Sequence, residues 1–218
     1  NTDLLLFKEN IFDAPLAFML KSDKLQLNLR RVTIMPIKNG VGYGEYTGVK
    51  IEHLSKILAM HMAITQAVLK RNARMYELAY RYIDMTAGKG KTPDGNLGSP
   101  LVFLDQAGMS KFDVPFRADF IECERANYDE LTVNVSTHPI FYVNREAIHF
   151  HPGDYSDVIP NLLKTKREDE LGLAFVDHSG DLPNFDLLNY ISKARPRMEL
   201  LIYLPATNVK RQYDKTNK

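Results

Sequence analysis

The sequence predicts a doubly wound α/β fold, in which helices cover both faces of a mostly parallel sheet. From about residue 80 onward, short apolar runs typical of buried strands alternate with segments of helical periodicity. Strands separated by helices are joined by right-handed crossovers, which place the strands parallel. The candidate strands are residues 81–85, 116–122, 148–151, 173–177 and 199–204. The helices between them are expected to begin near Ser99, Asn127, Tyr155 and Asn184.

Two further segments precede these strands. Between residues 49 and 81 apolar side chains recur at helical spacing without an internal proline or glycine, which predicts one helix or two. Residues 24–37 read KLQLNLRRVTIMPI, an alternation typical of a half-buried strand, and a glycine-rich stretch follows them. We therefore expect a β-rich N-terminal extension over residues 1–48 and an α/β domain over residues 49–218.

Composition and charge limit the classes of protein that fit. The chain has 28 basic and 27 acidic residues among its 218, so the charge balance neither demands nor excludes a nucleic-acid partner. Its single cysteine, Cys123, cannot form an intrachain disulfide or a thiolate metal cage, and a cytoplasmic location is expected. The apolar runs are short and interrupted by charge, so no membrane-spanning segment and no secretory signal is expected.

Ligands of doubly wound sheets bind beyond the carboxyl ends of the strands, so the residues after each strand are the candidates for function. The first strand is followed by Asp84, Thr86, Gly88 and Gly90. This spacing suits a backbone loop around a nucleoside-type ligand, whereas the alternative is a plain glycine turn. A phosphate-binding P-loop is excluded because Met85 stands where its first glycine is required.

Acidic residues follow the second and third strands as well. Glu122 can accept hydrogen bonds from both hydroxyls of a ribose, with Cys123 beside it at the same edge. Glu124 fits the alternative role of an acid at a helix N-terminus better than Glu122 does. Asp154 and Tyr155 can hold a purine through its exocyclic amine and its ring. In the alternative, Asp154 caps the next helix and Tyr155 packs against it.

The fourth strand ends at Asp177, which can orient an amine or hydroxyl nucleophile, although it could also be only a turn residue. Several histidines are candidate metal ligands. His149 and His151 share a strand face and could join His178 on zinc, but no fixed-spacing motif supports this and we expect no metal. On the long helix, His53 and His61 are expected to flank the solvent edge.

Together these strand ends resemble a class I S-adenosylmethionine-dependent methyltransferase. The chain is most similar to the three-Cys-motif partner proteins, a methyltransferase-like family, over about residues 50–211. The motifs that carry the resemblance are YIDMTAGKGK, TPDGNLGSPLVFL, FIECERANYDEL, AFVDHSG and ELLIYLPATNVKR. It implies a Rossmann-like methyltransferase sheet and S-adenosylmethionine as cofactor. In this pattern, Asp84 to Gly90 form the methionine-side loop, Glu122 binds the ribose, Asp154 and Tyr155 bind the adenine, and Asp177 stands at the catalytic strand.

The chain also departs from the pattern. Asp177 is followed by His178 where the family usually has proline, and the proline pair of amino-methyltransferases is absent, which argues against methylation of an amino group. Cys123 is badly placed to attack a pyrimidine, which argues against methylation at cytosine C5. Only five core strands are found where such sheets normally have seven. Either the chain is a fragment of a longer protein, or N-terminal strands fill part of the sheet.

The resemblance implies methyl transfer from S-adenosylmethionine to a nucleic acid. The alternative is a catalytically inactive binding or assembly subunit with a protein partner. Two groups of basic residues could contact phosphates, although solvated faces would explain them equally well. They are Lys70, Arg71, Arg74 and Arg81, and Arg195, Arg197, Lys210, Arg211, Lys215 and Lys218.

Overall fold

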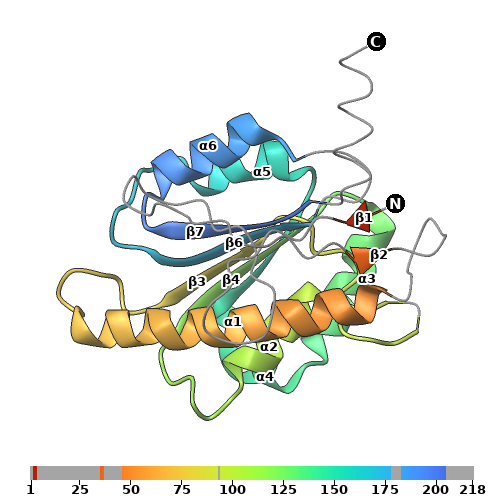
Figure 1. Cartoon of the computed structure of the whole chain (residues 1–218), viewed down its shortest axis with the longest axis horizontal. Coiled ribbons are helices and arrows are strands. Elements are labelled where there is room, and N and C mark those ends of the chain that lie inside the picture. The colour runs from red at the N-terminus through yellow and green to blue at the C-terminus, as the bar shows by residue number, and fades with distance from the viewer. Residues whose placement is uncertain (1, 4–34, 37–45, 93, 178–182, 205–218) are drawn as a thin grey trace.

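The centre of the protein is a five-stranded sheet in which every neighbouring pair of strands is parallel (Figure 1). The computed structural model describes residues 2–3, 35–36, 46–92, 94–177 and 183–204. The strand order is β5-β4-β3-β6-β7. The strands are β3 (Tyr80–Asp84), β4 (Phe116–Glu122), β5 (Ile148–Pro152), β6 (Leu171–Asp177) and β7 (Met198–Tyr203). The predicted Rossmann-like α/β fold is confirmed.

Helices cover both faces of this sheet, each with its own hydrophobic core. One core joins the sheet to α1, α2 and α3, and the other joins it to α5 and α6, which lie above the sheet in Figure 1. The helices are α1 (Tyr46–Arg71), α2 (Ser99–Ala107), α3 (Arg125–Ser136), α4 (Pro139–Asn144), α5 (Tyr155–Leu162) and α6 (Phe185–Ala194), and a single 3-10 turn, η1 (Arg145–Ala147), follows α4.

The chain order places a topological switch at the middle of the sheet. From β3 the chain moves outward to β4 and β5, then returns to place β6 on the other side of β3 and β7 beyond it. The chain therefore leaves β3 toward one side of the sheet and leaves β6 toward the other. Doubly wound sheets bind ligands at the point between two such strands. Asp84 lies opposite Phe175 in this pairing, two residues before β6 ends.

The central strand is buried on both faces because its residues alternate between the two cores. Tyr80 and Tyr82 point to the first core, where the ring of Tyr82 stacks on Phe103 with centroids 4.2 Å apart. Ile83 belongs to the second core. Gly172 of β6 lies beside the carbonyl oxygen of Arg81, where a Cβ would approach to 1.8 Å. Only glycine therefore allows β3 and β6 to pair at this point.

A buried network of charges links the strands near their amino ends. Arg81 is only 5% exposed, and its guanidinium forms an ion pair with Asp119 at 2.6 Å. His151 contacts the same carboxylate at 2.8 Å, and Glu170 lies between Arg81 and Arg195. Arg81 and Arg195, two of the basic residues that could contact phosphates, are buried and paired with acids, so neither lies on a solvated face.

The long helix is shorter than its apolar pattern predicts. α1 ends at Arg71, and Asn72 closes it by donating from its amide and its side chain to the carbonyl of Val68, both at 3.0 Å. Residues 72–79 form turns that lead into β3. The helix expected near Asn127 begins at Arg125. The short helix α4 was not predicted, and it starts on a proline with its first turn capped by His138.

Little of the N-terminal extension falls within the described residues. β1 (Thr2–Asp3) pairs antiparallel with β2 (Met35–Pro36), and α1 already begins at Tyr46, inside the expected extension. Residues 24–34 of the predicted alternating strand lie outside the described residues. The boundary at residue 48 therefore stays a prediction. Among the helices of the described segments, none has both the length and the apolar character that crossing a membrane requires.

Candidate functional site

The carboxyl ends of the three central strands bring three acids to one edge of the sheet. Asp84 ends β3, Glu122 ends β4 and Asp177 ends β6, and β3 pairs directly with both other strands. These are the strand ends where the sequence predicts a nucleoside-type ligand. The structure thus gathers the principal predicted residues at the switch point, and their contacts differ from one acid to the next.

Glu122 ties the glycine turn after β3 to the end of β4. One oxygen of its carboxylate accepts a hydrogen bond from the amide of Gly88 at 2.9 Å, and the other accepts from the amide of Glu124 at 2.8 Å. The residue is 7% exposed. Two backbone donors to one carboxylate are charge-assisted and hold its orientation. Glu124 itself occupies the N-cap position of α3, as expected from the sequence.

Both glycines of the turn after β3 have a backbone conformation that favours glycine, and they differ in what surrounds them. Gly88 and Gly90 have φ angles of 59° and 75°, a conformation that favours glycine. A Cβ built on Gly88 would meet no atom within 4 Å, whereas one on Gly90 would contact Leu131 at 3.4 Å and Asn134 at 3.6 Å. Gly88 therefore has an open side that a ligand can approach, and Gly90 packs beneath α3.

Asp84 supports this turn from inside the protein. Its carboxyl is fully buried, which raises the pKa of Asp84 to about 7 against the opposing effect of hydrogen bonds from Ser99, the Thr86 amide and Tyr82. The Thr86 amide donates to its Oδ1 at 3.2 Å. The predicted contact with loop amides is present. Because no part of Asp84 is exposed, this residue shapes the loop rather than touching a ligand directly.

Asp177 is held from two sides. Its backbone amide donates to Oγ1 of Thr86 at 2.8 Å, which joins the β3 turn to the end of β6. Its carboxylate forms an ion pair with Lys50 of α1, and the Lys50 ammonium also lies 4.9 Å from the centre of the Tyr203 ring. Sequence reasoning missed Lys50 and Tyr203. No local signal marks Lys50, because it is an ordinary lysine near the start of a helix.

Asp154 and Tyr155 have the second of their two predicted roles, in which Asp154 caps the next helix and Tyr155 packs against it. Asp154 accepts a hydrogen bond from the Ser156 amide at 2.7 Å and caps α5. Tyr155 is 7% exposed, belongs to the core under α5 and α6, and accepts from the Asn184 amide at 3.3 Å. The amide of Gly153 donates to the carbonyl of Glu122 at 2.9 Å. The cap thus lies beside the Glu122 turn, but little of the tyrosine ring is available to a ligand.

Cys123 is exposed next to this acidic edge. Partial burial of the sulfur and the negative charges of Glu122 and Glu124 raise the pKa of the Cys123 thiol. Its sulfur lies 3.8 Å from Oε1 of Glu122. A raised thiol pKa disfavours the thiolate that nucleophilic attack requires. The geometry agrees with the interpretation that Cys123 borders the site without acting as a nucleophile.

The histidines have structural partners. The expectation that His61 flanks the solvent edge of α1 is wrong: it is 7% exposed and lies between Tyr80 and Glu199. His151 is bound to Asp119, and burial lowers the pKa of His149. His178 lies outside the described residues. Within the described segments no group of three or more acids, histidines or cysteines is placed to hold a metal ion.

No protein-family model matches the chain, and no curated protein matches its sequence significantly. The resemblance to methyltransferases therefore depends on the motifs quoted above. The geometry of the strand ends is the independent basis for a proposal about function.

Proposed function

We propose that the protein binds S-adenosylmethionine at the carboxyl ends of β3 and β4 and transfers its methyl group to a nucleic acid. The observation that carries this proposal is the hydrogen bond from the Gly88 amide to Glu122. It places a glycine turn with an open side against an oriented carboxylate, at the switch point of a Rossmann-like sheet. A nucleoside with an attached amino-acid chain needs this combination of a hydroxyl acceptor and an accessible backbone.

The residues present fit such a cofactor at its ribose and methionine ends. A carboxylate oxygen has two lone pairs. Oε1 of Glu122 already accepts from the Glu124 amide and from the side chain of Asn127 at 3.5 Å. Oε2 accepts from the Gly88 amide and has a lone pair left for a ribose hydroxyl. The missing side chain at Gly88 leaves space beside the turn. The adenine end fits less closely, since Tyr155 is largely covered and Asp154 already caps α5. When bound, S-adenosylmethionine supplies an electrophilic methyl group.

The acceptor side would be formed by Asp177 and its neighbours. Asp177 can accept a hydrogen bond from the attacking group, and the Thr86 contact holds the backbone of Asp177 beside the glycine turn. The ammonium of Lys50 and the ring of Tyr203 lie next to it. A cation and an aromatic ring are the groups that contact a phosphate and stack on a base. These neighbours support a nucleic acid as the acceptor.

Calorimetric titration with S-adenosylmethionine tests the cofactor assignment. We expect binding to the wild-type protein and at least about tenfold weaker binding to Glu122→Gln, because an amide loses charge-assisted hydrogen bonds to the ribose. Glu124→Gln is the matched control, since it makes the same change two residues away at an exposed N-cap. Circular dichroism confirms that each variant is folded. Absence of heat at millimolar cofactor, or equal affinity in Glu122→Gln, would overturn the proposal.

One observation favours a second function, that of a binding subunit without methyl transfer. The Asp177 carboxylate is already paired with Lys50, so the group expected to orient the acceptor is occupied by the protein itself. A survey with radiolabelled cofactor and RNA, DNA and protein acceptors separates the two functions. Cofactor binding without transfer to any acceptor, in wild type and in Lys50→Gln, would select the binding subunit.

A further inference from the structure

A groove lies between α1 and the first residues of β6 and β7, at the opposite end of the strands from the glycine turn. Its volume is about 460 Å³, within the range of small-molecule sites. Its apolar walls are Ile57, Met60, Ile64 and Val68 from α1, with Leu171 and Pro196 from the strand side. Met60 and Ile64 are 36% and 60% exposed, so the apolar wall is accessible to solvent.

A carboxylate stands at the groove and is oriented from behind by two buried residues. Tyr80 is fully buried, and its hydroxyl contacts Nδ1 of His61 at 2.6 Å. The other ring nitrogen, Nε2, donates to the carboxylate of Glu199, whose oxygens accept. Glu199 is 34% exposed and lines the groove. Its carboxylate is therefore both fixed and accessible.

A cation stands beside this carboxylate and does not pair with it. Arg197 lies in the turn directly before β7, two positions before Glu199, and both residues line the groove. Arg197 donates to the hydroxyl of Tyr76 at 3.1 Å and stacks on its ring at 5.5 Å, and it forms no ion pair with any carboxylate of the described residues. The two opposite charges are thus held apart, each by a partner from α1 or the turn after it.

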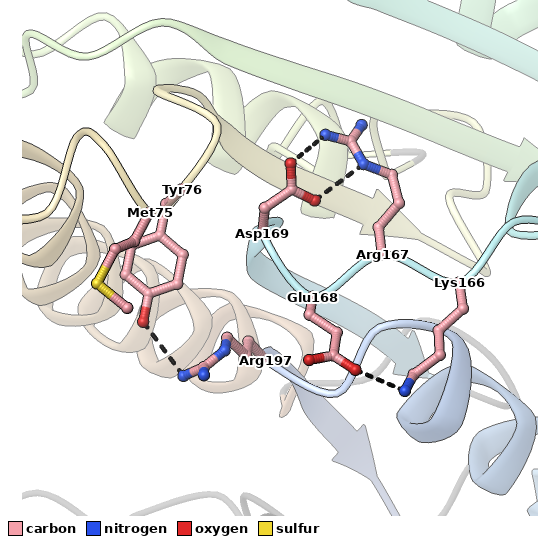
Figure 2. A pocket seen from close by; sticks show the side chains of 7 residues that line it. All are labelled: Met75, Tyr76, Lys166, Arg167, Glu168, Asp169 and Arg197. Atoms are coloured by element: carbon pink, nitrogen blue, oxygen red, sulfur yellow. Dashed lines mark hydrogen bonds and ion pairs between the residues drawn. The ribbon is translucent and has the colours of Figure 1, made fainter.

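The carboxylates next to the groove are paired with other cations, so Arg197 is available to a ligand. Figure 2 shows the adjoining hollow of about 410 Å³, which shares Tyr76 and Arg197 with the groove. There Glu168 is bound by Lys166 at 2.6 Å, and Asp169 is bound by Arg167 through two hydrogen bonds. The acids of this hollow therefore have their own cations, and the guanidinium of Arg197 points toward the hydroxyl of Tyr76.

We propose that the groove binds a small zwitterion with an apolar body, of the class of the apolar α-amino acids. The ligand carboxylate would contact Arg197, its ammonium would contact Glu199, and its side chain would lie against Ile57, Met60 and Ile64. A ligand with only one charge satisfies one of the two groups and is repelled by the other. A zwitterion satisfies both and buries its apolar part against the helix.

A set of analogues tests this on the wild-type protein, so that no variant has to fold. L-leucine carries both charges, leucinamide lacks the carboxylate, and 4-methylpentanoate lacks the ammonium. We expect calorimetric binding of L-leucine and at least about tenfold weaker binding of each analogue, because each loses one charge-assisted contact. No heat with tens of millimolar L-leucine, or an analogue that binds as well as L-leucine, would overturn the proposal.

Methionine methyl resonances show where the ligand binds. Met60 lines the groove, whereas Met109 is similarly exposed at 39% and lies outside it. With ¹³C-methyl methionine labelling, L-leucine should shift the Met60 signal and leave the Met109 signal in place. A shift confined to methionines away from the groove would contradict the assignment.

Charge-neutralising variants complete the test. Glu199→Gln and Arg197→Gln should each weaken L-leucine binding at least about tenfold. The matched controls are Glu146→Gln and Arg145→Gln, two exposed residues of η1 that lie outside the groove. Equal loss in the controls, or no loss in the two groove variants, would reject the proposed contacts. Because S-adenosylmethionine is not used, this result is independent of the proposed methyl transfer.

Discussion

The ammonium of Lys50 and the carboxylate of Asp177 form an ion pair that joins α1 to the end of β6, with the ring of Tyr203 beside the ammonium. The two side chains are 28% and 19% exposed, so solvent screens the pair only in part. The contact fixes the first turns of α1 over the carboxyl end of the sheet. Its strength therefore bears on access to the proposed acceptor side.

A double-mutant cycle measures this pair. We expect Lys50→Gln and Asp177→Asn to show a coupling free energy of about 1 kcal/mol in urea unfolding, because the pair is partly exposed. The exposed helical pair Lys56 and Glu52, whose side chains are 59% and 62% exposed, is the control and should couple more weakly, because solvent screens it. Coupling no larger than that of the control would show that the Lys50 contact is weak in solution.

The raised pKa of Asp84 makes the free energy of unfolding depend on pH. The folded-state pKa is about 7, whereas the ordinary pKa of an aspartate is 3.8, so between these values the folded protein keeps a proton that the unfolded chain releases. Raising the pH through this window therefore favours unfolding. Relative to wild type, Asp84→Asn should gain about 1 kcal/mol of stability per pH unit from pH 4 to 7 and level off above pH 7.

Urea unfolding of both proteins at half-unit pH steps checks this dependence. Asparagine keeps an oxygen that can accept from the Thr86 amide, so the turn after β3 should persist in the variant. Stability curves that run parallel from pH 4 to 7 would contradict this dependence, because Asp84 would then be ionised in the folded protein across that window.

Gly172 is expected to tolerate no side chain. A Cβ there would lie 1.8 Å from the carbonyl oxygen of Arg81, which is backbone and cannot move without separating β3 from β6. Gly172→Ala should lower the free energy of unfolding by about 3 kcal/mol or more. Gly48→Ala is the control: a Cβ there meets nothing within 4 Å, and alanine should stabilise α1 by about 0.5–1 kcal/mol. Thermal and urea unfolding compare the two, and equal effects would contradict the steric argument.

Asp119 is the acid on which the buried charge network depends. Asp119→Asn leaves the guanidinium of Arg81 buried without its partner at 2.6 Å, which should cost about 3–5 kcal/mol. Asp129→Asn removes an acid from an exposed pair with Arg125 and should cost less than about 0.5 kcal/mol. Urea unfolding at neutral pH gives both values. A small loss for Asp119→Asn would mean that Glu170, which lies 4.0 Å from the Arg81 guanidinium, compensates for the lost charge.

The strands and their polar ends could be predicted because both depend on local patterns. The apolar pattern predicts the bounds of β4 correctly and those of β3 to within a residue. Parallel pairing of the strands then brings Asp84, Glu122 and Asp177 to one edge of the sheet. The capping role of Asp154 was one of two interpretations of the sequence, since an acid before a helix can either cap that helix or contact a ligand. The choice between them depends on the burial of Tyr155, which no local pattern reveals.

Contacts between distant parts of the chain could not be predicted. His61 and Glu199 are 138 positions apart, and Lys50 and Asp177 are 127 apart. Each residue alone is ordinary on its helix or strand, and only the placement of α1 across β6 and β7 brings the pairs together. The early end of α1 also depends on a contact between distant parts of the chain. The residues after α1 are apolar enough to continue a helix, but they turn toward the sheet, where the Glu77 amide donates to the carbonyl of Asp169.

The central position of β3 also determines the order in which the sheet can be completed. During synthesis β4 and β5 emerge first and can pair on one side of β3, whereas its other neighbour, β6, emerges only after α5. Until then β3 exposes a row of unpaired backbone groups, in a strand whose five residues are all buried in the finished protein. An open apolar edge of this kind recruits other chains. A chaperone that covers β3 until β6 arrives should therefore raise the soluble yield of this protein.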